Sequence, residues 1–451
     1  MSLATIAERE GDDELKMIAS TQLNLGGPEL IDNREQGAEI SKLNLDSGKI
    51  AMKKSDFFLA YSFFDYGISY LRKGHWERNY SLSLELFSLF ATCAFMNAEY
   101  GNLKTILQEI MHRAKCVKDK LNAIFISIRL KMFSGQVDEA IKMTTKVLKS
   151  LGEDIPDIIT PSVTHELVEV AKEKLADISD EVFLTYPLIV DPMKNEVMKL
   201  LELLLTLFAF ADYRACQPFI ASKMILISLS SGFSDLSPVA FAYWSNYLTL
   251  VEKTKFGEGR RYAKLALSLL RVSSSRICDA SVIIRTTHTK MHIEPLQSTL
   301  EFFLEGHKAA MKSGETGQAV SASMFYDIGG FWVGKKLSAV CDSMRDTIIQ
   351  AKIYNNKLFL TMLLPVYSVA LRMSGGTDKK QTDSNESPAN SKERIYTSKL
   401  TSHVLMKSFN GFYEALIFRE LDKAENSANT FYETQSQSTT SMSGAMFMRD
   451  L

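Results

Sequence analysis

Apolar residues along most of the chain recur at the spacing of an α-helix. Between 103 and 114 they fall at i, i+3, i+4, i+7 and i+11, a single apolar stripe formed by Leu103, Ile106, Leu107, Ile110 and Ala114. No proline occurs between Pro28 and Pro156, and proline in a helix interior costs about 3 kcal/mol. The pattern therefore predicts that the first third of the chain is almost wholly helical.

Turn residues between the amphipathic segments predict that the helices form hairpins. Ser134-Gly135 lies between expected helices at 121–133 and 137–151, which would make them an antiparallel pair. A small residue one turn from a bulky one lets neighbouring helices approach closely, as in stacked helical repeats. That spacing recurs in three places: Ala60–Gly67, Ala140–Val147 and Ala263–Leu270.

Prolines punctuate the second half of the chain, and no strand pattern emerges there. The β-branched run at 281–285 sits amid helical spacing and is predicted to be helical. The expected helices of this half are 194–211, 221–230, 239–251, 262–270, 296–311, 318–328, 336–353 and 357–373.

These patterns predict an all-α fold, a TPR-like α-α superhelix in the form of an irregular solenoid of about sixteen to eighteen helices. The chain divides by composition into six parts. They are a disordered or fragmentary lead over 1–21, a first helical segment over 22–157, a second one continuous with it over 158–373, a disordered polar loop over 374–396, a terminal hairpin over 397–432 and a polar tail over 433–451.

Net charge argues against two classes of partner. The 52 basic and 53 acidic side chains give a formal net charge of −1, so the basic excess that holds nucleic acid or anionic membranes is missing. The apolar stretches 200–211 and 358–371 are shorter than the ~20 residues that span a bilayer. We expect neither nucleic-acid binding nor membrane insertion.

Cysteine usage points to a reducing compartment. The five cysteines form no CxxC pair, so neither a disulfide framework nor a zinc ribbon is encoded. They are expected to be buried free thiols. The acidic N-terminus lacks the apolar core of a secretory signal, and a cytoplasmic location is expected.

The segment Gly329–Lys336 has the GxxxxGK spacing of a phosphate-binding loop. Lys336 stands where Ser or Thr should hold magnesium, and the preceding residues are helical in pattern where a buried strand is required. Bulky Phe331 and Trp332 would also obstruct the amides that bind phosphate. We expect a glycine-terminated helix whose aromatic residues pack on the next hairpin.

Other potential chemical sites have stronger structural interpretations. His288 and His292 share a helix face with Glu294 following, but Thr289 occupies the place of a metalloprotease glutamate, so metal binding is not expected. Two acidic pairs, Asp12-Asp13 and Glu153-Asp154, are expected to be solvated, because charged side chains are rarely buried.

Two further features are assigned to packing. Trp76 is expected to join two helices, with an exposed partner-binding role as the alternative. The 20 methionines indicate an adaptable core or a groove that can repack. No motif of a nucleophilic enzyme is present, and we expect no catalytic, cofactor-binding or metal-binding residue.

Several segments together resemble a known family of helical arms. They are QLNLGGPELI at 22–31, LNLDSGKIAMKKSDFFLAYSFFDYGISYL at 43–71, HWERNYSLSLELF at 75–87, AKCVKDKLNA at 114–123, GQVDEAIKMTTKVLKSLGEDIP at 135–156, SGETGQAVSASMFYDIGG at 313–330 and LSAVCDSMRDTIIQAKI at 337–353. Their order resembles the TPR-like arm that follows the ATPase domain in large signalling, STAND-type ATPases. Those proteins carry an origin-recognition-like AAA ATPase module, often fused to kinase, GAF or histidine-kinase modules.

The resemblance implies a non-catalytic sensor or scaffold arm that binds a protein, a peptide or a neighbouring domain. The ATPase module itself has no counterpart in these residues, so ATP hydrolysis is not expected of them. A free-standing TPR-like adaptor is the alternative, and a cryptic enzyme is a third reading. The sequence leaves open whether the chain is complete or a fragment of a larger protein.

We predict that limited trypsin digestion cuts first within 374–396. That stretch has too little apolar surface to offset the entropy of ordering it. Mass spectrometry of the earliest fragments checks this. A first cut within 57–151 would contradict the division given above.

Overall fold

The computed structural model describes residues 12–375 and 401–437, except for 32, 212, 253–254 and 274. Within these residues the chain forms twenty-one α-helices and no strand, with one isolated parallel bridge between Leu188 and Phe233. The predicted all-α, TPR-like class is confirmed. The number of helices exceeds the expected sixteen to eighteen, partly because short helices such as α5 (His75–Arg78) and α11 (Asp180–Leu184) lie in stretches for which the apolar spacing predicted no helix.

The helices fall into two compact units. The first comprises the residues up to Leu130 together with Met311–Gly314, and the second comprises Lys131–Ala310 and the residues from Glu315 onward. The sequence pattern placed the division between its two continuous helical segments at 157/158, whereas the units divide after Leu130, inside helix α8 (Val117–Phe133).

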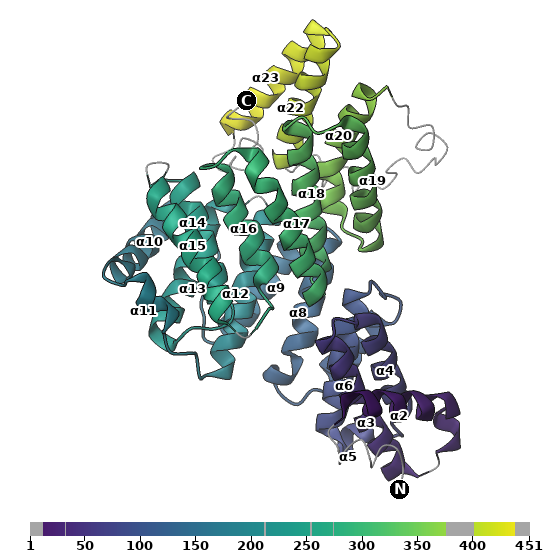
Figure 1. Cartoon of the computed structure of the whole chain (residues 1–451). Helices are drawn as coiled ribbons and strands as arrows, with labels where there is room; N and C mark the ends of the chain where they lie inside the picture. Colours follow the sequence, from purple (N-terminus) through teal and green to yellow (C-terminus); the bar gives the residue numbers. More distant parts are fainter. Residues whose placement is uncertain are drawn as a thin grey trace. The chain divides into compact units, whose positions relative to one another are not determined.

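The first unit is built of short helical pairs. Its helices, besides α5 and most of α8, are α2 (Asp13–Gly26), α3 (Arg34–Lys53), α4 (Phe57–Ser69), α6 (Tyr80–Met96) and α7 (Leu103–Arg113) (Figure 1). Helix α3 packs on α4, and α4 packs on α6. At the first of these contacts a Cβ on Gly48 would lie 2.3 Å from the ring of Phe64. The glycine therefore sets how closely α3 and α4 approach.

The N-terminal lead was expected to be disordered over 1–21, and for residues 13–21 this is wrong. They lie in α2, whose first turn is capped by the Asp12 carboxylate, which accepts hydrogen bonds from the amides of Glu14 at 2.8 Å and Leu15 at 3.2 Å. A side-chain oxygen at this position satisfies amides that have no partner within the helix. Residues 1–11 lie outside the described part.

The second unit continues the same architecture over a longer stretch. Its helices are α9 (Val137–Ser150), α10 (Pro161–Ala176), α11, α12 (Pro192–Phe210), α13 (Gln217–Ser231), α14 (Ser237–Leu250), α15 (Phe256–Val272), α16 (Asp279–Met291), α17 (Leu296–Ser313), α18 (Thr316–Trp332), α19 (Leu337–Ile353), α20 (Lys357–Met373), α22 (Thr401–Ile417) and α23 (Leu421–Gln437). From α12 to α16, and again from α18 to α20, each helix packs on the next one along the chain.

Most of the predicted helices are confirmed. The β-branched run 281–285 is helical within α16. The apolar stretch 200–211 forms the largely buried C-terminal half of α12, which ends at Phe210. No helix of the described residues has the length and hydropathy needed to cross a bilayer.

The small positions of the recurring pattern are buried, as expected. Ala60 and Ala140 are 0% exposed and Ala263 is 4% exposed. Helix α9 packs on α12. The predicted pattern of α9 ends at Val147, but Val147 is only half-buried and the next residue, Leu148, is the fully buried one. Close helix contacts at small residues are therefore a real feature of both units.

At the place of the expected terminal hairpin, α22 and α23 pack against each other. Helix α23 continues to Gln437, so the first residues assigned to the polar tail are helical. The expected disordered loop at 374–396 lies outside the described residues from 376 onward, as does the tail from 438 onward.

We predict that Ala140→Trp destabilises the protein by about 1–3 kcal/mol or more, because Ala140 is fully buried on α9 and an indole cannot fit there. Lys142 on the same helix is exposed, so Lys142→Ala should stay within about ±0.5 kcal/mol. Denaturant melts of both variants beside the parent measure the difference. Equal midpoints would mean that Ala140 does not lie in a close helix contact.

Candidate interaction surface

The phosphate-loop spacing at 329–336 is confirmed as a packing feature of α18. A Cβ on Gly329 would lie 2.5 Å from Leu300 of α17, so this glycine permits a close helix contact. Trp332 lies 5.1 Å from Phe409 and 5.0 Å from Tyr413 on α22, ring centroid to ring centroid. The aromatic residues therefore pack on α22 of the terminal hairpin, not on the helices that directly follow α18 along the chain, and Gly334 ends the helix with φ +75°.

The histidine pair is not assembled into a metal site. His288 is 6% exposed, and its ring lies 4.6 Å from that of Phe325 and 5.6 Å from that of Phe303. Glu294 instead pairs with Arg260 of α15 at 3.6 Å. Within the described ranges no group of three or more His, Cys, Asp or Glu side chains could hold a metal ion.

Trp76 and the cysteines behave mostly as packing residues. Trp76 is 5% exposed and lies 5.1 Å from Phe87, so its role in joining α5 to α6 is confirmed. All five cysteines are free. Burial raises the pKa of Cys93 to about 12. Cys116, by contrast, is exposed, so the expectation that every thiol is buried is wrong there.

The acidic pair Glu153-Asp154 was expected to be solvated, and for Glu153 this is wrong. Its carboxylate accepts hydrogen bonds from Lys194 Nζ of α12 at 2.6 Å and Lys223 Nζ of α13 at 3.0 Å. Gly152, with φ +85°, ends α9 and turns the chain toward those two helices. Burial alone would raise the pKa of Glu153, but the two lysines lower it, so the carboxylate stays ionised and joins three helices.

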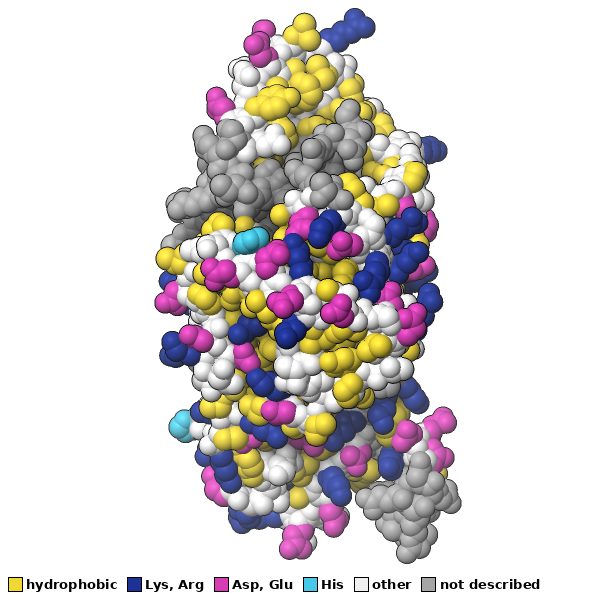
Figure 2. Space-filling model, turned by 90° about the vertical axis from the view of Figure 1, so that its left-hand side faces the viewer, with side chains coloured by type: hydrophobic (Ala, Val, Ile, Leu, Met, Phe, Trp, Pro, Cys, Tyr) yellow, Lys and Arg dark blue, Asp and Glu magenta, His cyan; other side chains and the backbone are white. Residues whose placement is uncertain are grey.

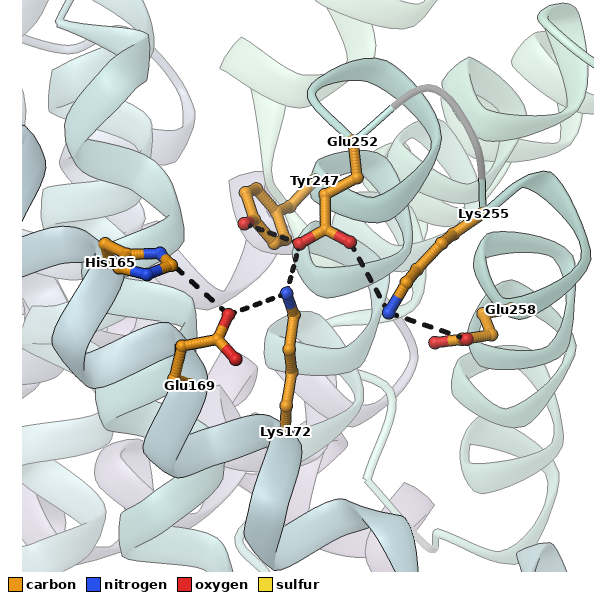
Figure 3. A network of polar contacts seen from close by, with 7 residues as sticks. All are labelled: His165, Glu169, Lys172, Tyr247, Glu252, Lys255 and Glu258. Carbon is orange, nitrogen blue, oxygen red and sulfur yellow. Dashed lines mark hydrogen bonds and ion pairs between the residues drawn. The ribbon is translucent and has the colours of Figure 1, made fainter.

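A larger charged network joins α10 to the chain between α14 and α15 (Figure 3). Lys172 of α10 donates to Glu169 at 2.9 Å and to Glu252. The hydroxyl of Tyr247 also donates to Glu252, at 2.9 Å, and Lys255 Nζ lies 3.6 Å from the other oxygen of that carboxylate. Glu252 is therefore the centre of the network.

Lys172, Tyr247 and Glu252 each keep one protonation state at neutral pH. Burial would lower the pKa of Lys172, but its hydrogen bonds with Glu252 and Glu169 outweigh burial and raise it. Burial together with the Glu252 carboxylate raises the pKa of Tyr247 to about 12, while the pKa of Glu252 is lowered by its donors despite burial. General acid or base catalysis needs a pKa near the working pH, so we interpret the network as a clamp between helices.

Asp327 is a buried carboxyl that the sequence analysis did not single out. It is 2% exposed on α18 and accepts hydrogen bonds from two residues of α19, Ser343 at 2.5 Å and Thr347 at 2.6 Å. Burial raises its pKa to about 6 against the effect of both hydroxyl groups. Its enclosure between two helices keeps it from any substrate in solution.

Exposed apolar side chains gather at the turn between α22 and α23. Leu416, Ile417, Phe418 and Leu421 are each between 42% and 69% exposed, although turns are usually polar. In Figure 2 hydrophobic side chains collect at the upper end of the view, where this hairpin lies. We call these four residues the apolar turn.

The apolar turn has a defined backbone. The amide of Phe418 donates to Glu414 O at 3.0 Å and that of Glu420 to Ala415 O at 2.8 Å, and Arg419 takes a φ of +59°. Arg372 of α20 pairs with the Glu414 side chain at 2.5 Å, and its guanidinium lies 5.1 Å from the Phe418 ring centroid. These contacts hold the turn in one conformation. In the sequence, three consecutive apolar residues at 416–418 precede the charged pair Arg419-Glu420. This run was the signal that could have identified the apolar turn.

Comparison with known proteins gives little further information. No family model matches the chain, and no curated protein matches it. Among solved structures it is similar to a Rap protein, in a crystal structure of that protein complexed with competence and sporulation factor. The identity is 11%, over 89% of this chain and 98% of that chain, and the TM-score is 0.48. This degree of similarity carries no information on what this chain binds.

We predict that Asp327→Asn becomes more stable relative to the parent as the pH rises from 4 to 8. The pKa of Asp327 is raised in the folded state, so its stabilising effect is present at low pH and is lost as the pH rises through about 6. Asn cannot ionise, so the variant avoids the decrease in unfolding free energy, on the order of 2–3 kcal/mol, that ionisation of Asp327 causes in the parent.

Urea melts at the two pH values give the difference in unfolding free energy between variant and parent. Asp157→Asn, at an exposed position, serves as the control and should track the parent at both values. A difference for Asp327→Asn that does not change with pH would contradict the raised pKa.

Proposed function

We propose that the chain is a non-catalytic interaction and regulatory arm that binds a protein partner through the apolar turn. The observation that carries this proposal is the exposure of four large apolar side chains within 416–421. Clustered exposed apolar residues are typical of sites that bind another protein. A turn held by Arg372 and Glu414 presents them with little loss of conformational entropy on binding.

The polar clusters of the described residues support a non-catalytic role. The carboxylates Glu153 and Glu252 are each held by lysines from neighbouring helices. Their pKa values are lowered away from neutrality. Asp327, which titrates closer to neutral pH, is enclosed between α18 and α19. These groups are arranged to hold helices together and not to act on a substrate.

The parent context that we propose is a signalling ATPase of the AAA type, with this chain as its TPR-like arm. The resemblance of segments such as 43–71 and 135–156 supports it, and so does the packing of α3 on α4 within the first of them. A free-standing adaptor is the alternative. Sequencing the transcript upstream of Met1 separates the two, because an in-frame phosphate loop there favours the arm and an upstream stop codon favours the adaptor.

The interaction is tested by charging the apolar turn. We expect the double variant Phe418→Asp, Leu421→Asp to capture at least tenfold less partner protein than the parent in quantitative affinity purification from the native host. An aspartate in a desolvated apolar contact has no compensating partner. The matched control is Val272→Asp on α15, a residue that is 60% exposed and distant in sequence from the turn.

The control should keep the partner proteins that the double variant loses. Circular dichroism and melting of all three proteins confirm that the fold is intact. If the same proteins are captured in equal amounts by the parent and both variants, the apolar turn is not the binding site.

A further inference from the structure

One short segment of this helical protein is extended and has one of its two backbone edges paired. The amide of Phe233 donates to Pro187 O at 2.8 Å, and the amide of Ile189 donates to Phe233 O at 2.9 Å. In an extended chain, the backbone groups of successive residues point to opposite edges. The N–H and C=O groups of Leu188 and Val190 therefore face the outer edge, where none of the described backbone groups bonds to them.

The extended segment is held firmly from its inner side. A Cβ on Gly232, which has a φ of +102°, would lie 2.8 Å from Ile189 N, so only glycine allows this close approach. Tyr186 packs on Phe233 with a centroid distance of 4.8 Å, and its hydroxyl donates to Leu229 O at 2.9 Å. The outer edge is thus fixed before any partner arrives, which lowers the entropy cost of binding.

The outer side of this segment is apolar and exposed. Leu188 is 76% exposed and Val190 is 90% exposed, and residues two apart in an extended chain lie on the same face. Val182 of the adjacent helix α11 is a further exposed apolar side chain, at 48%. An unpaired edge with apolar side chains is a template for another strand.

The charged residues within 180–191 are all acidic. From 180 to 191 the charged residues are Asp180, Glu181 and Asp191, with no Lys or Arg among them. Asp180 pairs with Arg261 of α15 at 2.8 Å. The pKa of the exposed Glu181 is lowered mainly by hydrogen bonds with its own backbone and Ser179, with a smaller contribution from the same arginine. A segment that docks here therefore gains from a basic residue beside its apolar ones.

We propose that the outer edge of Pro187–Val190 binds an extended peptide segment of a partner protein, which adds as a β-strand with apolar residues at alternate positions and a flanking Lys or Arg. The backbone groups of Leu188 and Val190 supply the hydrogen bonds, and their side chains cover the apolar residues of the peptide. The short length limits the number of hydrogen bonds, which suits a reversible contact. This surface is separate in sequence from the apolar turn, so either proposal can fail without the other.

The test uses the full chain and a fluorescein-labelled panel of heptapeptides that alternate Val or Ile with Thr between terminal lysines. We expect saturable binding, followed by fluorescence anisotropy. Two N-methylated versions of the tightest peptide separate strand addition from hydrophobic adhesion. Methylation along one peptide edge should abolish binding and methylation along the other should preserve it, because only one edge faces the protein.

The matched protein variants act on the same backbone groups. Val190→Pro removes an outer-edge N–H but leaves the inner pairing through Ile189 and Pro187 intact, and it should weaken binding about tenfold. Val190→Thr keeps the N–H and should bind within about threefold of the parent. Amide exchange at Leu188 and Val190, measured by NMR, should slow when peptide is bound.

Four outcomes would overturn the proposal. They are binding by no peptide of the panel up to millimolar concentration, equal effects of the two N-methylated peptides, unchanged exchange at Leu188 and Val190 in the bound state, and dimerisation of the parent without peptide that is lost in Val190→Pro. The last outcome would assign the edge to pairing between two copies of this chain. A double charge at the apolar turn, Phe418→Asp and Leu421→Asp, should leave peptide binding unchanged.

Discussion

The distance at which neighbouring helices pack is the constraint on which this structure depends. A Cβ on Gly317 of α18 would lie 2.6 Å from the Phe133 ring, and one on Gly306 of α17 would lie 2.9 Å from Ile284 of α16. Both side chains are thus accommodated only because the facing residue is glycine. Where the core is distributed along a series of helices, each pair is stabilised by its neighbours, and a residue too large at one contact affects the next.

This constraint is local in sequence, which is why the helices were predictable. Helix α20 has the predicted bounds of 357–373 and continues through Pro365. Helix α15 begins at Phe256, six residues before the predicted start at 262, because its polar first turn at 257–259 contributes nothing to an apolar stripe. Errors of this kind are confined to helix ends, where spacing gives no signal.

The polar contacts between helices were not predictable, because they join residues that are far apart in the chain. Glu153 follows a glycine in a stretch that looks like a solvated turn, and its two partners lie on α12 and α13. Glu252 depends in the same way on Lys172 of α10. A carboxylate at a helix end is usually exposed, and only the positions of neighbouring helices reveal that it is enclosed by cations. The apolar turn was missed because the sequence shows that Phe418 is apolar but does not show whether another helix covers it.

An all-helical protein satisfies its backbone hydrogen bonds internally, so it presents partners with side chains alone. Recognition at the apolar turn would follow this rule, with specificity set by the shape of four side chains. The segment 187–190 departs from it, because Pro187 and Pro192 bound a stretch too short to become a helix and too extended to satisfy its own N–H groups. Backbone pairing at such an edge would tolerate many peptide sequences, whereas the proposed binding at the apolar turn would discriminate between surfaces. A chain with both can hold one specific partner and still respond to a second that is recognised mainly by its extended conformation.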